Sequence, residues 1–178
     1  NPSTPVRFRP QPHKLFMNIR IKKAVIPVAG LGTRMLPATK AIPKELLPIV
    51  DKPIIQYVVE EAIDAGIEEF ILVTRSGKEA IENHFDANFE LEHKLEISGK
   101  KKILKKVQNV LPKKIKISSV RQEESKGLGH AILCADHLLN GEPFAVLLPD
   151  EIIYSADDIK NFQMMIKYWE DTSCGQIL

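Results

Sequence analysis

Short apolar runs alternate with helical patterns along this chain, and this alternation restricts the fold more than any other feature. Four runs of β-branched and other apolar residues read as strands, namely residues 23–28, 69–74, 115–120 and 144–148. Turn residues bound each run. Helical spacing between the first two runs begins at Pro53, which suits a first helical turn, and Gly66 suits the C-terminal cap.

Further helical patterns cover residues 86–109, with a break at Ser98 and Gly99, and then residues 128–139 and 157–169. Because mostly apolar strands alternate with helices, we expect an α/β fold with a Rossmann-like, mixed but mostly parallel sheet and helices on both faces. Ligands in such sheets bind beyond the carboxyl ends of the strands. Segments far apart in the sequence are therefore expected to face one pocket.

Composition excludes several classes of protein. The 178 residues are 44% hydrophobic, which is enough for one sizeable core, and a net charge of +2 gives no general attraction to nucleic acid or membrane. No apolar run approaches the roughly 20 residues of a membrane span, and no signal peptide is visible. We expect a cytoplasmic protein with no nucleic-acid or membrane partner, and with Cys134 and Cys174 as reduced thiols.

A glycine-rich turn follows the first apolar run, where Gly30 and Gly32 can offer bare backbone N–H groups to an anion. Two cations, Arg34 and Lys44, are close enough in sequence to converge on that anion. Pro43 stiffens the backbone beside Lys44, whose charged arm is free to reach phosphate. The pattern indicates handling of a nucleoside triphosphate, and an ordinary strand-to-loop turn with a solvated arginine is the alternative.

The two commonest glycine motifs do not fit this turn. A dinucleotide fingerprint needs a third glycine where Met35 stands, with Pro37 just behind it. A P-loop needs a glycine-lysine pair at a spacing that neither this turn nor the isolated Gly77 and Lys78 supplies. A Rossmann cofactor site and a P-loop are therefore both disfavoured.

Four separated segments together resemble one enzyme family. They are AGLGTRMLPATKAIPKELLPI, VTRSGKEAIENHFD, RQEESKGLGHAILCA and LLPDE, in that order. The combination is similar to the bacterial UTP–glucose-1-phosphate uridylyltransferases, within the wider sugar-phosphate nucleotidyltransferase family. The likeness begins near Ile21 and continues to the end of the chain.

The resemblance implies an activity and a set of site residues. It implies Mg2+-dependent formation of UDP-glucose and pyrophosphate from UTP and glucose 1-phosphate, in a nucleotide-diphospho-sugar transferase type of fold. The implied roles are catalysis by Arg34 and Lys44, metal binding by Asp150, and nucleotide binding by Ala29, Gly30, Gly32, Thr33, Glu45, Gln122 and Gly127. The family commonly has a second acid after this aspartate, and here that position is Glu151 rather than aspartate. Related enzymes are often homo-oligomers, which we expect for the full-length enzyme.

Gln122 and Gly127 are the candidates for base recognition. A side-chain amide both donates and accepts hydrogen bonds, so Gln122 can pair with the edge of a uracil, and Gly127 permits close approach of the backbone. Without the resemblance, both positions also suit a strand end and the lead into a helix. We expect His84 and His130 to be structural or surface residues.

Two alternatives stay open at this point. A related enzyme such as a glucose-1-phosphate thymidylyltransferase would carry the same phosphate-binding turn, and a non-catalytic nucleotide-binding module would retain the fold.

The lysines of residues 100–106 lack interleaved aromatic residues, so a solvated helix face balanced by nearby glutamates is favoured over nucleic-acid binding.

The two ends of the chain differ from the rest. Residues 1–16 are proline-rich and lack apolar periodicity, and we interpret them as a flexible extension or an expression remnant. Residues 17–178 are expected to be the N-terminal nucleotide-binding part of a nucleotidyltransferase domain. Enzymes of the resembled family continue further, so the chain is expected to be C-terminally truncated and to lack the sugar-phosphate residues.

Overall fold

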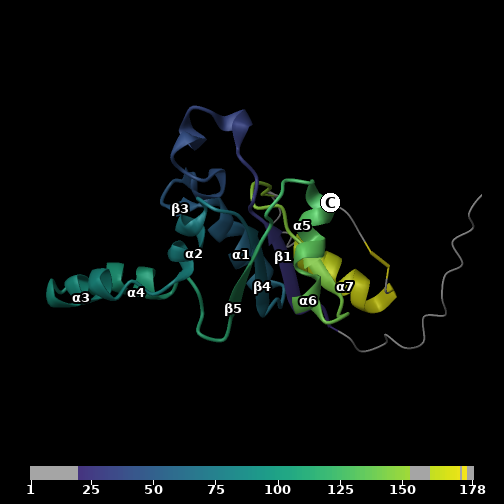
Figure 1. The fold of residues 1–178 in the computed structure, drawn as a ribbon. Helices are drawn as coiled ribbons and strands as arrows, with labels where there is room; N and C mark the ends of the chain where they lie inside the picture. Colours follow the sequence, from purple (N-terminus) through teal and green to yellow (C-terminus); the bar gives the residue numbers. More distant parts are fainter. Residues whose placement is uncertain (1–19, 153–160, 173, 176–178) are drawn as a thin grey trace, which may run out of the picture.

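A parallel four-stranded sheet forms the centre of the molecule (Figure 1). The computed structural model describes residues 20–152, 161–172 and 174–175. The strands of the central sheet are β1 (Lys23–Pro27), β4 (Glu69–Thr74), β5 (Lys116–Arg121) and β6 (Phe144–Val146). Their spatial order is β5-β4-β1-β6, and all three pairings are parallel. A separate antiparallel hairpin joins β2 (Pro48–Ile49) to β3 (Lys52–Pro53).

Helices cover both faces of this sheet. The described helices are α1 (Ile54–Asp64), α2 (Glu79–Phe85), α3 (Phe89–Ile97), α4 (Lys101–Gln108), α5 (Leu128–Cys134), α6 (Asp136–Leu139) and α7 (Asn161–Thr172). Helices α1, α2 and α7 contribute to the larger core cluster, whereas α5 and α6 pack in a second cluster. The expected α/β architecture is confirmed.

Alternation along the strands divides the core between the two faces. Ala24 and Ile26 of β1 belong to the larger cluster, whereas Val25 between them belongs to the smaller one. Phe70 and Ile71 of β4 separate in the same way. Successive strand residues point to opposite faces, so a sheet with helices on both sides needs apolar residues at nearly every position.

Three short 3-10 turns lie in the loop that follows β1: η1 (Thr33–Met35), η2 (Ala38–Lys40) and η3 (Lys44–Leu46). In Figure 1 this loop is the purple-to-blue segment at the top of the view. Its backbone turns on local hydrogen bonds, including Leu46 N–H to the Pro43 carbonyl at 2.9 Å. The loop spans the distance between β1 and α1 and carries most of the predicted phosphate-binding residues.

Helices α3 and α4 form a hairpin that projects away from the sheet (Figure 1). Gln108 at the end of α4 donates to the Glu92 carboxylate at 2.9 Å, and neither helix contains a buried residue. The lysines of residues 100–106 are exposed, and Lys106 pairs with Asp51 at 3.1 Å. The break expected at Ser98 and Gly99 is confirmed, since Gly99 has a φ of +66° between the two helices.

Most strand and helix predictions agree with the structure within one or two residues. The strand expected at 69–74 is confirmed in full, whereas β6 ends at Val146, two residues before the expected 148. The helix expected at 128–139 divides into α5 and α6 at Ala135. Part of the helix expected at 157–169 and the extension at 1–16 lie outside the described residues. None of the helices in the described part of the chain has the length and apolar character needed to cross a membrane.

Candidate active site

The strand order reverses between β1 and β6. From β1 the chain builds the sheet outward through β4 and β5, and it then returns to place β6 on the other side of β1. Ligands of open α/β sheets bind at such a switch point, outside the carboxyl ends of the strands. The loop that carries Gly30 follows β1, and Asp150 comes shortly after β6.

An ion pair bridges these two loops. Lys44 Nζ lies 2.6 Å from Asp150 Oδ2, although the two residues are 106 positions apart in the sequence. Their side chains are only 16% and 21% exposed, so water screens the pair less than it would at an open surface. The fold therefore brings together the predicted phosphate-binding cation and the predicted metal ligand.

The glycines of the loop pack against Lys44. Gly32 has a φ of +68°, in the left-handed region that favours glycine, and its carbonyl accepts from Thr39 Oγ1 at 2.7 Å. A Cβ at Gly32 would lie 3.2 Å from Thr39 Cβ and 3.3 Å from Lys44 Cβ. A Cβ at Gly30 would lie 3.7 Å from Lys44 Cε. Glycine at position 32 thus leaves room for Lys44 beside the loop, whereas a Cβ at position 30 would make only ordinary contact with the lysine.

Glu45 is fully buried and makes a second ion pair beneath the loop. Its Oε2 accepts from Lys78 Nζ at 2.8 Å, and the Lys78 side chain is itself only 9% exposed. Glu45 Oε1 is buried without a hydrogen-bond partner among the described residues. The pair links η3 to the segment between β4 and α2. In this structure the carboxylate thus faces the protein interior, and a nucleotide contact by Glu45 stays a prediction.

Gln122 and Gly127 lie together at the end of β5. The backbone N–H of Gln122 donates to the Thr74 carbonyl at 2.8 Å, which fixes the residue beside the end of β4. Its side-chain Nε2 lies 3.2 Å from the Gly127 carbonyl oxygen and 3.1 Å from His130 Nδ1. The proposed base-recognition residues are therefore in direct contact with each other and with α5.

The other predicted residues are placed around the first loop. Ala29 is 5% exposed at the end of the β1 segment, whereas Gly30 and Thr33 are exposed. Arg34 is exposed in η1, and no residue in the described part of the chain forms an ion pair with it. Arg34 forms no ion pair with Asp150 in the part of the chain that the structure describes, so its catalytic role stays a prediction.

Among the described residues, Asp150 would need oxygen atoms from a substrate or from water to hold a divalent cation. In the described ranges, no three His, Cys, Asp or Glu side chains gather closely enough to hold a metal ion. Mg2+ typically binds through one or two carboxylates together with substrate phosphates and waters. A single partly exposed carboxylate at the switch point suits that kind of site.

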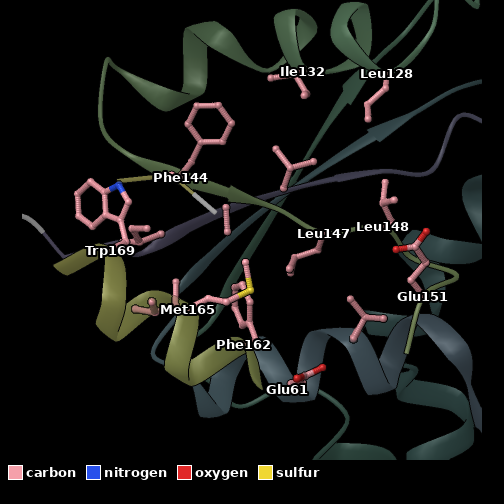
Figure 2. A pocket seen from close by; sticks show the side chains of 16 residues that line it. Glu61, Leu128, Ile132, Phe144, Leu147, Leu148, Glu151, Phe162, Met165 and Trp169 are labelled. Carbon is pink, nitrogen blue, oxygen red and sulfur yellow. The ribbon is translucent and has the colours of Figure 1, made fainter. Parts of the chain in front are cut away.

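An apolar pocket of about 520 Å³ lies beside β6, between α5 and α7 (Figure 2). Phe144, Met165 and Trp169 are among its lining residues, and Glu61 and Glu151 supply its carboxylates. None of the ten predicted site residues lines it. The lining residues include no lysine or arginine that could bind phosphate, so the pocket does not fit the predicted phosphate chemistry.

His84 lies outside the site and is a structural residue, as expected. Gln56 Nε2 donates to the Glu60 carboxylate at 2.8 Å, so Gln56 Oε1 faces His84 Nε2 at 3.0 Å and accepts from it. Burial lowers the pKa of His84 below its usual value of 6.5. The neutral imidazole with its proton on Nε2 fits both observations.

A ligand site at the switch point of an open parallel sheet is typical of α/β domains that bind nucleotides, and this is the class of protein that the fold defines. The chain matches the family model described as nucleotidyl transferase over residues 23–176. Because this match covers most of the chain, the protein belongs to the nucleotidyl transferase family.

Curated relatives share more than half of their aligned residues with this chain. The UTP–glucose-1-phosphate uridylyltransferase of Escherichia coli K12 is 56% identical over 165 residues, which cover 91% of this chain and 55% of that protein. The Haemophilus influenzae enzyme of the same name is 57% identical over 159 residues, which cover 88% of this chain and 54% of that protein. The chain thus spans about half the length of the curated relatives it matches.

Solved structures show the same fold. UTP-bound UGPase from Acinetobacter baumannii superimposes with a TM-score of 0.83 at 49% identity, covering 86% of this chain and 54% of that one. A UDP-glucose pyrophosphorylase complexed with UDP-glucose gives a TM-score of 0.73 at 45% identity, covering 86% and 55%.

Sequence reasoning missed the contacts made by two residues. The spacing around Lys78 disfavours a P-loop, and nothing in its local sequence indicates a buried partner 33 residues away. His130 lies in the quoted Gly-Leu-Gly-His segment, eight residues after Gln122, but its contact with that side chain depends on how α5 packs. Neither contact follows from spacing alone.

Proposed function

We propose that the protein is a UTP–glucose-1-phosphate uridylyltransferase that forms UDP-glucose and pyrophosphate. The observation that carries this proposal is the Lys44–Asp150 pair, which places a cation and a carboxylate together at the switch point of a nucleotidyl transferase fold. The names of the relatives, and the related structures bound to UTP and to UDP-glucose, support the choice of nucleotide and product.

The reaction is an in-line displacement. A phosphate oxygen of glucose 1-phosphate attacks the α-phosphorus of UTP, the bond from that phosphorus to the β-phosphate bridging oxygen breaks, and pyrophosphate leaves. The nucleophile is already an anion, so no strong general base is needed, and positioning with charge neutralisation carries the rate. Lys44 neutralises the α-phosphate region, and Arg34 neutralises the departing pyrophosphate.

Backbone and side chains hold the nucleotide from two sides. In this proposal Ala29, Gly30, Gly32 and Thr33 form the phosphate-binding turn, with Glu45 supporting it. Gln122 and Gly127 contact the base. The two groups of residues extend from the carboxyl ends of β1 and β5, on either side of β4.

Mg2+ is the proposed cofactor, and Asp150 is the residue that would hold it. When bound, the ion would neutralise charge on the reacting phosphates. Asp150 Oδ2 accepts from Lys44, so the carboxylate that would hold the ion already lies beside the lysine that we propose neutralises the α-phosphate.

The proposal also covers the whole protein. We propose that the full-length enzyme is cytoplasmic and homo-oligomeric, and that glucose 1-phosphate is its second substrate. We also propose that residues 17–178 are the nucleotide-binding part of a longer domain, which is supported by coverage of 54–55% of the curated relatives. Residues 1–16 would lie outside that domain.

A pyrophosphate-release assay tests the proposal on the complete protein that carries this sequence. With UTP, glucose 1-phosphate and Mg2+, we expect release of pyrophosphate that requires all three. Lys44→Ala and Asp150→Asn should each lower kcat at least about 100-fold, since each removes charge needed at the reacting phosphates. Arg34→Ala should also lower kcat.

Lys94→Ala is the matched control, because among the residues that the structure describes Lys94 pairs only with Glu90, on the surface of α3, with both side chains more than 70% exposed. It should retain the parent activity. Complete protein that binds UTP but releases no pyrophosphate would instead identify a non-catalytic nucleotide-binding module. Faster turnover of dTTP than of UTP would identify a thymidylyltransferase.

A further inference from the structure

The orientation of the Gln122 side-chain amide is fixed by a backbone carbonyl. The Gly127 oxygen can only accept a hydrogen bond, so the amide atom 3.2 Å from it must be the NH2 group. Gly127 has a φ of +89°, in the region that favours glycine, and this conformation places its carbonyl in reach of Gln122. The amide nitrogen therefore points toward the start of α5, and the amide oxygen points away from the Gly127 carbonyl.

His130 binds the same NH2 group. Its Nδ1 lies 3.1 Å from Gln122 Nε2, and since that nitrogen is a donor, Nδ1 must accept. Nδ1 therefore carries no proton, and the ring proton is on Nε2. The two N–H bonds of the amide are thus both engaged, one by Gly127 and one by His130.

One acceptor of the amide remains available. Gln122 is only 8% exposed, and within the described part of the chain no donor reaches its Oε1. Gln122 Oε1 is not among the described side-chain atoms that are fully buried without a partner, so it keeps accessible surface through which a ligand can donate to it. The amide nitrogen is held by two acceptors. A rotation that offered the NH2 group to a ligand would place the amide oxygen against the Gly127 carbonyl, where two acceptors would repel each other.

We propose that His130 is a positioning residue for base selection: together with the Gly127 carbonyl it holds Gln122 so that the amide presents only an acceptor to the nucleobase. This inference rests on the proposed role of Gln122 in nucleotide binding and adds the residue that orients its amide. A base that suits the acceptor is a pyrimidine with a hydrogen-bond donor at N3.

The N3 atom distinguishes the bases. Uracil and thymine carry a proton on N3 and can donate to Gln122 Oε1. Cytosine has a lone pair on N3, so the two acceptors would face each other and the hydrogen bond would be replaced by repulsion. The arrangement therefore selects against cytosine nucleotides but does not separate UTP from dTTP through this contact.

Two substitutions of nearly equal size test the role of His130 in the complete protein. His130→Asn keeps an acceptor oxygen near the place of Nδ1, whereas His130→Leu removes it. The measurement is the ratio of kcat/KM for UTP to that for CTP, together with the ratio of their binding constants from calorimetry. If His130 only supported the fold, its substitution would change kcat/KM and the binding constant by the same factor for UTP and for CTP. Both ratios would then stay unchanged.

We expect His130→Leu to lower the UTP-to-CTP ratio about tenfold, the factor that corresponds to one hydrogen bond. His130→Asn should keep the ratio within about threefold of the parent value. Cys134→Ala is a control for the Cys134 sulfur, which lies 3.9 Å from His130 Nδ1, and it should leave the ratio unchanged. Equal ratios in the Asn and Leu variants would overturn the proposal, and thermal melting curves verify that each variant is folded.

The binding measurement separates this inference from the proposed function. Complete protein that releases no pyrophosphate, but whose UTP-to-CTP binding ratio falls in His130→Leu alone, would refute the enzyme activity and support the role of His130. Active protein whose UTP-to-CTP ratio is the same in His130→Leu as in the parent would support the enzyme activity and refute the role of His130. Protein that binds neither nucleotide would overturn both.

Discussion

At the scale of single residues, Glu45 places a charge where water cannot reach it. The carboxylate has one ionic partner, Lys78, and one oxygen without a hydrogen bond among the described residues. Burial of an ion pair costs desolvation that the mutual attraction only partly offsets. The pair therefore adds little net stability, and its position suggests instead that it holds η3, and with it Lys44, at a fixed distance from β4.

Removing one partner should be far more damaging than removing both. Lys78→Met leaves the Glu45 carboxylate buried without its counter-charge, and we expect it to lower the free energy of unfolding by about 3–5 kcal/mol. The double variant Glu45→Met with Lys78→Met should recover most of that loss. Urea unfolding followed by circular dichroism measures both.

The exposed pair of Lys22 and Glu68 provides the comparison. Its nitrogen and oxygen lie 3.0 Å apart, but the side chains are 52% and 48% exposed. Lys22→Met should therefore change the free energy of unfolding by less than about 1 kcal/mol. If Lys78→Met cost no more than Lys22→Met, the buried pair would not be charged in the folded protein.

The sequence indicated that Lys44 and Asp150 lie near each other but not the contacts that they make, and their chemical roles stay predictions. Lys44 and Asp150 follow from the resemblance and from their places after strands, and the structure brings them within 2.6 Å. The engagement of Lys44 with Asp150 in place of phosphate, and the burial of Glu45, could not be predicted. They depend on how three loops pack, which sequence spacing does not encode.

At the scale of elements, the phosphate-binding turn depends on two separate properties of Gly32. Its φ of +68° is unfavourable for any residue with a Cβ, and the space beside it is filled by Thr39 and Lys44. The first property concerns the backbone alone. The second connects the turn to the lysine that we propose acts on the α-phosphate.

The two effects can be separated by comparing alanine substitutions. Gly99 has a nearly equal φ of +66°, but a Cβ there would meet nothing within 4 Å. Gly99→Ala and Gly32→Ala should therefore share a backbone cost of about 1–2 kcal/mol. Only Gly32→Ala should lower kcat in the pyrophosphate-release assay, by about tenfold or more, because it displaces Lys44.

Unfolding experiments on the same two variants give the backbone cost directly. Parent-like turnover by Gly32→Ala would mean that the turn adjusts without moving Lys44. Loss of turnover in Gly99→Ala would mean that the α3–α4 hairpin contributes to activity in a way that its exposed position does not indicate.

Elements with strong periodicity were predictable, whereas short ones were not. Strand β4 and the break between α3 and α4 agree with expectation, because an unbroken apolar run and a glycine are strong local signals. The hairpin of β2 and β3 was missed, since two-residue strands carry no periodicity. β6 is shorter than its apolar run because only residues up to Val146 pair with β1, while Leu147 still donates from its backbone to Val25.

At the scale of the whole molecule, the two edges of the sheet differ in character. β5 presents polar residues along one edge, including Lys116 and Ser118, and charged or polar edges discourage pairing with other chains. β6 at the opposite edge is apolar, with Val146 38% exposed, and the 520 Å³ pocket lies against it (Figure 2). The surface of a monomer in water is expected to be mostly charged and polar, and the β6 edge differs from that expectation more than the β5 edge does.

The apolar edge should bind a hydrophobic dye in the native state of the 178-residue chain. The pocket falls within the size range of small-molecule sites, so we expect saturable binding of anilinonaphthalene sulfonate. Trp169 is the chain's single tryptophan and lines the pocket, so its excitation should transfer energy to the bound dye. Val146→Gln should weaken binding about threefold, because it replaces apolar lining with an amide.

Ser118→Gln on the opposite edge is the matched control, since it introduces the same side chain on an exposed residue of β5. It should leave dye affinity unchanged. Equal weakening by both substitutions would show that the dye binds partly unfolded protein, and energy transfer lost with dye still bound would place the dye away from Trp169. Weakening confined to Val146→Gln would establish that the β6 edge, rather than the phosphate-binding turn at the switch point, is the apolar binding surface of the chain.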